Sequence, residues 1–123
     1  MTIDSTNASL FDKLNGLESL AASDRVMPAG VAYAIVKSIM AMRTALEPCK
    51  IVREQIIRRY ADGGTTITRE ADPERFDACK KELDEIGNKR ITVDVEPVKL
   101  DEIRKANFTL KEMEGLMILI SEE

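Results

Sequence analysis

The chain has 123 residues, of which 44% are hydrophobic and 33% charged, and its formal net charge is −4. This length fits one domain, and the composition is typical of an ordered chain that buries a hydrophobic core. The acidic balance makes nucleic acid an unexpected partner, and the absence of histidine excludes Ser–His, Cys–His and His–metal chemistry. No apolar run approaches the ~20 residues of a membrane span and no signal peptide is recognisable, so we expect a cytoplasmic protein without membrane contact.

The N-terminal part is predicted to contain a flexible segment followed by a short helix. Residues 1–8 are polar and expected to be flexible, whereas residues 9–123 are expected to form a single helical domain. Ser9 is the expected N-cap of a helix that ends near Ala22. Its apolar positions lie at helical spacing and are Leu10, Leu14, Leu17 and Leu20.

A stripe of apolar residues from Pro28 to Tyr60 predicts one long helix. These positions recur at gaps of three and four: Val31, Ile35, Ile39, Met42, Leu46, Cys49, Val52, Ile56 and Tyr60. Such a helix would run roughly 50 Å, so it either carries a shorter helix along its side or packs on another copy of itself. The candidate self-association residues are Ile35, Ile39, Met42 and Leu46. Pro48 is expected to kink the helix, because proline removes one hydrogen bond of the helix interior.

The C-terminal half is predicted to add helices and a small β element. Asp72 caps a helix that reaches Ile86 and folds back antiparallel on the long helix. Residues 90–98 alternate between apolar and polar side chains, which predicts a strand, and residues 65–69 are its expected partner. A helical turn at residues 100–105 and a capping box of Thr109 and Glu112 then lead into a terminal helix that extends to Ile120. The predicted fold class is mostly α (α+β), with a long kinked helix, an antiparallel partner helix, short flanking helices and a minor two-stranded β element.

One group of basic residues is the best candidate binding site in the sequence: Lys50, Arg53, Arg58, Arg59 and Arg69. Arginine side chains bind phosphate and carboxylate groups bidentately, so this cluster could recognise a small anionic ligand or an acidic partner. A solvated helix face, in which Glu54 pairs with Arg58, explains the same residues without any ligand.

No other group of residues indicates a catalytic, metal or ligand-binding site. Cys49 and Cys79 lie on apolar stripes and are expected to be buried free thiols, with a disulfide as the alternative. The acidic residues of the 72–86 helix are mixed with lysines, as on a solvated face, and neither a metal-binding loop nor a phosphate loop is present. We therefore expect no catalytic residues, no metal site, no cofactor and no enzymatic activity.

The order of these segments resembles a family of small uncharacterised proteins encoded by tailed bacteriophages and prophages. The resemblance covers most of residues 9–120 and rests on the layout around "PAGVAYAIVKSI", "REQIIRRYAD", "FDACKKELDEI" and "ITVDVEPVKLDEI". It implies a phage accessory protein in the cytoplasm of a bacterial host, and it supplies no catalytic residues. Pro48 departs from the uninterrupted long helix that this layout implies.

These observations favour a non-enzymatic binding protein. We expect a homo-oligomer that binds and blocks a host factor or sequesters a small phosphate-bearing ligand. The alternative is a structural or assembly accessory of the virion, such as a head or tail factor or a chaperone. Nucleic acid is an unlikely partner on the basis of charge.

Overall fold

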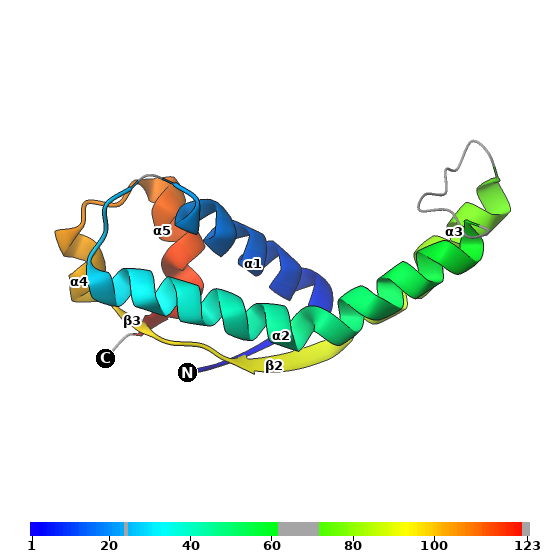
Figure 1. The fold of residues 1–123 in the computed structure, drawn as a ribbon, viewed down its shortest axis with the longest axis horizontal. Coiled ribbons are helices and arrows are strands. Elements are labelled where there is room, and N and C mark those ends of the chain that lie inside the picture. The colour runs from blue at the N-terminus through cyan, green and yellow to red at the C-terminus, as the bar shows by residue number, and fades with distance from the viewer. Residues whose placement is uncertain (24, 62–71, 122–123) are drawn as a thin grey trace.

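The long helix α2 (Ala29–Tyr60) is the spine of the computed structural model, which describes residues 1–23, 25–61 and 72–121. Its first half belongs to a compact body, and its second half projects from that body together with α3 as a two-helix arm (Figure 1). The other elements, in chain order, are β1 (Thr2–Thr6), α1 (Asn7–Ala21), α3 (Pro73–Gly87), β2 (Arg90–Asp94), β3 (Val98–Lys99), α4 (Leu100–Lys105), α5 (Leu110–Leu116), a 3-10 turn (Met117–Leu119) and β4 (Ile120–Ser121). The predicted fold class, mostly helical with a long helix and a small sheet, is confirmed.

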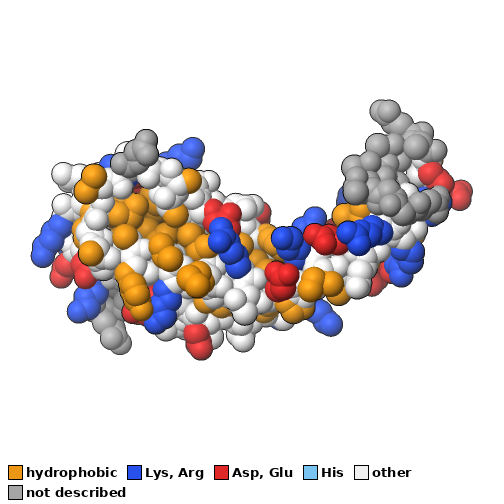
Figure 2. Space-filling model, viewed as in Figure 1, with side chains coloured by type: hydrophobic (Ala, Val, Ile, Leu, Met, Phe, Trp, Pro, Cys, Tyr) orange, Lys and Arg blue, Asp and Glu red, His pale blue; other side chains and the backbone are white. Residues whose placement is uncertain are grey.

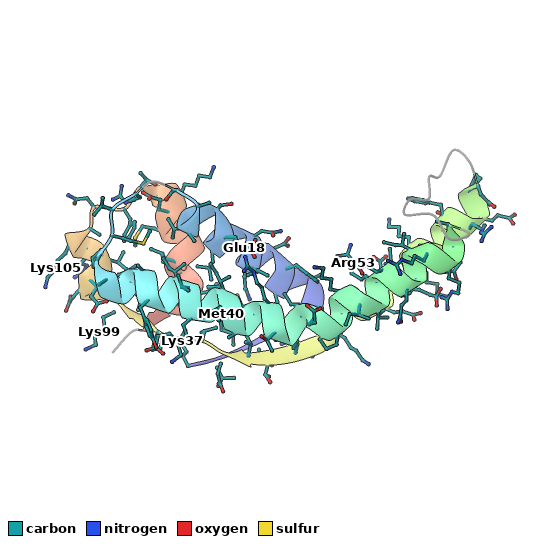
Figure 3. The ribbon with its side chains drawn as sticks, viewed as in Figure 1. Glu18, Lys37, Met40, Arg53, Lys99 and Lys105 are labelled. Carbon is teal, nitrogen blue, oxygen red and sulfur yellow. The ribbon has the colours of Figure 1, made fainter. Side chains whose placement is uncertain are left out.

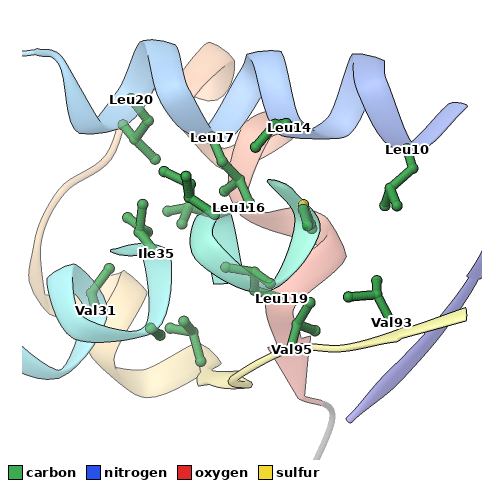
Figure 4. Close-up of a cluster of buried hydrophobic side chains, with 14 of the residues drawn as sticks. Leu10, Leu14, Leu17, Leu20, Val31, Ile35, Val93, Val95, Leu116 and Leu119 are labelled. Carbon is green, nitrogen blue, oxygen red and sulfur yellow. The ribbon is translucent and has the colours of Figure 1, made fainter. Parts of the chain in front are cut away.

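The inner face of α2 forms the centre of the core. The four residues proposed above for self-association, Ile35, Ile39, Met42 and Leu46, are at most 6% exposed. They pack in one cluster with the leucines of α1 and with apolar residues of β2 and of the C-terminal segment (Figure 4). Elements of the same chain already cover the four residues proposed for self-association, so in this fold they present no surface to a second copy. Burying a side chain of this size contributes about 1.5–3 kcal/mol.

The N-terminal segment forms a strand where flexibility was expected. β1 pairs antiparallel with β2, with Ile3 opposite Val93. α1 starts at Asn7 rather than after Ser9, and the Thr6 side chain caps it by accepting a hydrogen bond from the Ser9 N–H. A strand is thus confirmed within the predicted range 90–98, but it ends at Asp94, and among the described residues its partner is the N-terminal strand. The expected partner, residues 65–69, lies outside the residues that the structure describes.

Pro48 lies inside α2 without ending it. The helix is continuous from Ala29 to Tyr60, and its axis changes direction near the middle (Figure 1). The missing N–H of Pro48 leaves the carbonyl of Thr44 without its helical partner. Both residues are exposed, so water can satisfy that carbonyl. The prediction of one bent helix, rather than two independent helices, is confirmed.

The arm is anchored to the body at the end of α3. As predicted, Asp72 caps α3 and the helix packs along the second half of α2. Asn7, at the start of α1, donates its backbone N–H to the Lys89 carbonyl and its side-chain amide to the Ile86 carbonyl, both at 3.0 Å. Since α2 is continuous and α3 is tied down by Asn7, both helices of the arm have a fixed base.

The C-terminal segment adds a second small sheet that the sequence did not predict. α4 and the capping box of α5 form where expected. α5 ends at Leu116, however, and the chain turns into β4, which pairs in parallel with β3 through Val98 and Ile120. Extension of the terminal helix to Ile120 was therefore wrong, because a strand there completes the cover over Val98, which is 1% exposed.

Arg25 joins the connection between α1 and α2 to the connection between α4 and α5. Its guanidinium donates to the carbonyls of Ala106 and Asn107 and lies 4.8 Å from the centre of the Phe108 ring. Its Nε is 3.1 Å from a carboxylate oxygen of Glu112, an ion pair without an aligned hydrogen bond. This side chain holds the C-terminal helices against the body.

Met40 and Met42 lie on opposite faces of α2. Met42 is fully buried, whereas the side chain of Met40 is 63% exposed. We expect Met42→Ala to lower the free energy of unfolding by about 2–5 kcal/mol through the cavity it leaves. Met40→Ala should change it by less than about 0.5 kcal/mol.

Urea denaturation of both variants at one low protein concentration measures the difference. Equal losses of stability in the two variants would contradict the assignment of inner and outer faces.

Candidate functional site

The predicted basic cluster does not converge on one site. Lys50, Arg53, Arg58 and Arg59 are all exposed on the second half of α2. Lys50 and Arg59 are nine positions apart, which places them on opposite sides of a helix with 3.6 residues per turn. Arg69 lies outside the described residues. These side chains therefore surround the helix and form no common pocket for a small anion.

Two of these arginines already have partners within the chain. The Arg53 guanidinium lies 5.6 Å from the centre of the Phe11 ring of α1, which supports the base of the arm. Arg59 forms an ion pair with Glu82 of α3. Among the described residues Lys50 and Arg58 form no ion pair, so the expected pairing of Glu54 with Arg58 is not present. Of the four described cations, Arg53 and Arg59 therefore contact other elements of the fold, whereas Lys50 and Arg58 have no ion-pair partner among the described residues.

Arg59 belongs to a polar cluster that closes the arm. The Glu82 carboxylate accepts a hydrogen bond from Arg59, and its interactions with Arg59 and Tyr60 lower the pKa of Glu82. The interaction with Glu82 raises the pKa of Tyr60. Arg75 of α3 also donates to the Arg59 carbonyl at 3.3 Å. Because each of these contacts joins α2 to α3, the arrangement is that of a helix-pairing cluster.

The cysteines do not form a reactive centre. Cys49 and Cys79 are buried free thiols, as predicted. Burial raises the pKa of both thiols, which keeps them protonated and poorly nucleophilic. Within the described residues no group of three or more histidine, cysteine, aspartate or glutamate side chains is placed to hold a metal ion.

The outer face of α2 carries a second series of residues. Six exposed positions, at alternating gaps of four and three, form what we call the outer seam: Tyr33, Lys37, Met40, Thr44, Glu47 and Ile51. This spacing is the heptad pattern by which one helix packs on another. Hydrophobic side chains gather on the face of the body where α2 runs (Figure 2), and Lys37 and Met40 lie along the first half of that helix (Figure 3).

The apolar residues of this face are exposed to an unusual degree. The exposed fractions are 60% for Tyr33, 63% for Met40 and 46% for Ile51, and the neighbouring Val36 is 53% exposed. A single exposed apolar side chain is normal, but several on one helix face mark an interaction surface. Here Tyr33, Val36 and Met40 lie within about two turns, and Ile51 lies further along the same face. The spacing of positions 33, 37, 40, 44, 47 and 51 was visible in the sequence. It was overlooked because the apolar residues of the inner face of the same helix form a more regular series.

Two ion pairs form the border of this face, one through Lys37 of the outer seam itself and one through Arg43 beside the seam. Lys37 lies 3.0 Å from the Glu96 carboxylate, and Arg43 lies 3.0 Å from that of Glu18. The Glu96 carboxylate raises the pKa of Lys37, so the lysine stays charged. Because each pair is neutral, the border of this surface carries little net charge.

α2 is also long and apolar enough to cross a membrane, as judged by length and composition. An 18-residue window of the helix meets that test, and 39% of the window is buried inside the fold. A core helix with apolar residues on two faces passes the same test, so this composition is weak evidence. The absence of membrane contact stays a prediction.

The chain was compared with protein-family models, curated proteins and solved structures, and nothing matches it. The resemblance to phage and prophage proteins stays a prediction from the sequence.

The arm cluster gives a direct electrostatic test. We expect Arg59→Ala to raise the pKa of Glu82 towards its ordinary value, because the carboxylate loses its guanidinium partner. Since the folded-state pKa is lowered, ionised Glu82 stabilises the fold above the ordinary pKa of glutamate. That contribution disappears as the pH falls through the lowered value.

A carbon-13 NMR titration of the Glu82 side chain measures this pKa in both proteins. Arg58→Ala is the matched control, since Arg58 has no contact with Glu82, and it should leave the pKa unchanged. An unchanged pKa in Arg59→Ala would show that the cluster does not form.

Proposed function

We propose that this chain is a non-enzymatic binding protein that acts through protein–protein contact along the outer seam of α2. The observation that carries the proposal is the exposure of Tyr33, Met40 and Ile51 on one face of a helix whose opposite face is core. Covering this exposed apolar surface with another molecule would remove it from water, which is energetically favourable.

A protein partner fits this surface better than a small anion. The outer seam combines an aromatic residue, a methionine and an isoleucine with one lysine and one glutamate. Tyrosine and methionine are enriched at the centres of protein interfaces. By contrast, a phosphate site needs several converging donors, and the basic residues of the arm diverge around α2.

The biological setting of the proposal comes from the sequence. The resemblance to small phage and prophage proteins favours an accessory protein in the cytoplasm of a bacterial host, where it binds and blocks a host factor. A virion assembly factor would use the same kind of surface. Both roles require a helix face that contacts a protein, and neither requires a catalytic residue.

Site-specific photo-crosslinking in bacterial cells tests this function. A photoreactive p-benzoylphenylalanine at position 40 should form covalent protein adducts upon irradiation. The matched control places the same group at Asn15, an exposed position on α1 outside the outer seam. We expect adducts at position 40 that exceed those at position 15 by at least about tenfold.

Adducts of equal yield at both positions would contradict the proposal, because random collision would then explain them. Addition of Tyr33→Glu to the position-40 protein should abolish the adduct, since burying an unpaired charge in an apolar contact is costly.

A further inference from the structure

We propose that the partner of the outer seam is a second copy of this chain, packed antiparallel so that the two-fold axis crosses the outer face of α2 at the level of residue 42. This inference rests on the proposed function, because it names a second copy as the protein that covers the outer seam. A host factor that binds the same surface would then compete with self-association. It moves self-association from the buried inner face of α2 to the outer face.

The outer seam is self-complementary under this symmetry. A two-fold axis at the level of residue 42 pairs position 33 with 51, position 37 with 47 and position 40 with 44 of the other copy. Tyr33 then packs on Ile51, Lys37 meets Glu47, and Met40 packs beside Thr44. Every apolar residue meets an apolar or small neighbour, and the lysine meets a carboxylate in both halves of the interface.

Charge determines the direction of the pairing. In a parallel dimer, Lys37 would face Lys37 and Glu47 would face Glu47, which gives like-charge repulsion at two levels. In the antiparallel dimer, both contacts join opposite charges. Charged positions of this kind set partner choice and orientation when helices pair.

Glu47 is available for this contact within the described residues. Its side chain is exposed, and no described residue forms an ion pair with it. Lys37 is 56% exposed at its side chain although it pairs with Glu96. An ammonium group has three donors, so Lys37 can keep Glu96 and bind the carboxylate of Glu47 in the second copy.

The neutral border also favours a second copy over a charged partner. The Lys37–Glu96 and Arg43–Glu18 pairs cancel their own charges. Two such borders therefore meet without net repulsion, whereas a strongly acidic or basic partner would gain little from them.

The length of the outer seam limits the area that the dimer can bury, and therefore its affinity. Residues 33 to 51 span about 27 Å of helix at 1.5 Å per residue. One helix pair of this length buries less than the ~1,200 Å² of a standard stable interface. We therefore expect association in the micromolar range, with a monomer–dimer equilibrium that dilution shifts.

Sedimentation equilibrium over a range of concentrations measures this association. We expect Glu47→Lys to weaken the dimer roughly ten- to thirtyfold, because two attractive contacts become repulsive. Lys37→Glu should weaken it likewise. An equimolar mixture of the two variants should restore association, since their heterodimer again joins opposite charges at both contacts. Glu114→Lys makes the same change of charge on α5 and is expected to have no effect.

Two results would overturn the proposal. One is a chain that stays monomeric up to millimolar concentration; the other is a dimer that Glu47→Lys weakens no more than Glu114→Lys does. Circular dichroism of each variant confirms that the fold is intact.

The same experiments distinguish a failure of self-pairing from a failure of the proposed binding function. A monomeric chain that still gives position-40 adducts with a different protein would refute self-pairing and support the binding function. A monomeric chain without adducts at position 40 would refute both.

Discussion

The burial of the inner face of α2 against α1 is the interaction on which the rest of the structure depends. The leucines of α1 and the inner residues of α2 form one cluster, and β2, α4 and the C-terminal segment complete it. Once this face is buried, the opposite face of the helix must lie outside the body. The outer seam is therefore a geometric consequence of the core, and its apolar composition is the feature that the core does not explain.

The polar contacts of the chain serve mainly to hold elements in place. Asn7 ties the base of the arm to α1, Arg25 holds the C-terminal helices, and the Arg59–Glu82 pair closes the arm. The Arg59–Glu82 pair accounts for one of the cations that the sequence assigned to ligand binding. Lys50 and Arg58 have no such partner among the described residues, but they diverge around α2, whereas the exposed apolar residues share one face. This is why a protein contact is a better explanation than a small ligand.

The sequence predicted features that depend on local periodicity and capping. The inner stripe of α2, the Asp72 cap of α3 and the capping box of α5 need only residues close in the chain. The pairing of β1 with β2 joins residues about 90 positions apart, and no local signal specifies it. For the same reason the basic residues of α2 looked like a cluster in sequence although they diverge in space, and the inner stripe looked available to a second copy although α1 covers it.

Methionine oxidation by hydroxyl-radical footprinting, at low and high protein concentration, tests the central claim that α2 is core on one face and interface on the other. Met40 and Met42 report on the two faces from almost the same place in the chain. The account predicts that Met42 is protected at every concentration, and that Met40 is oxidised in dilute protein and protected in concentrated protein. Rapid oxidation of Met42 in the native protein, or oxidation of Met40 that does not depend on concentration, would contradict it.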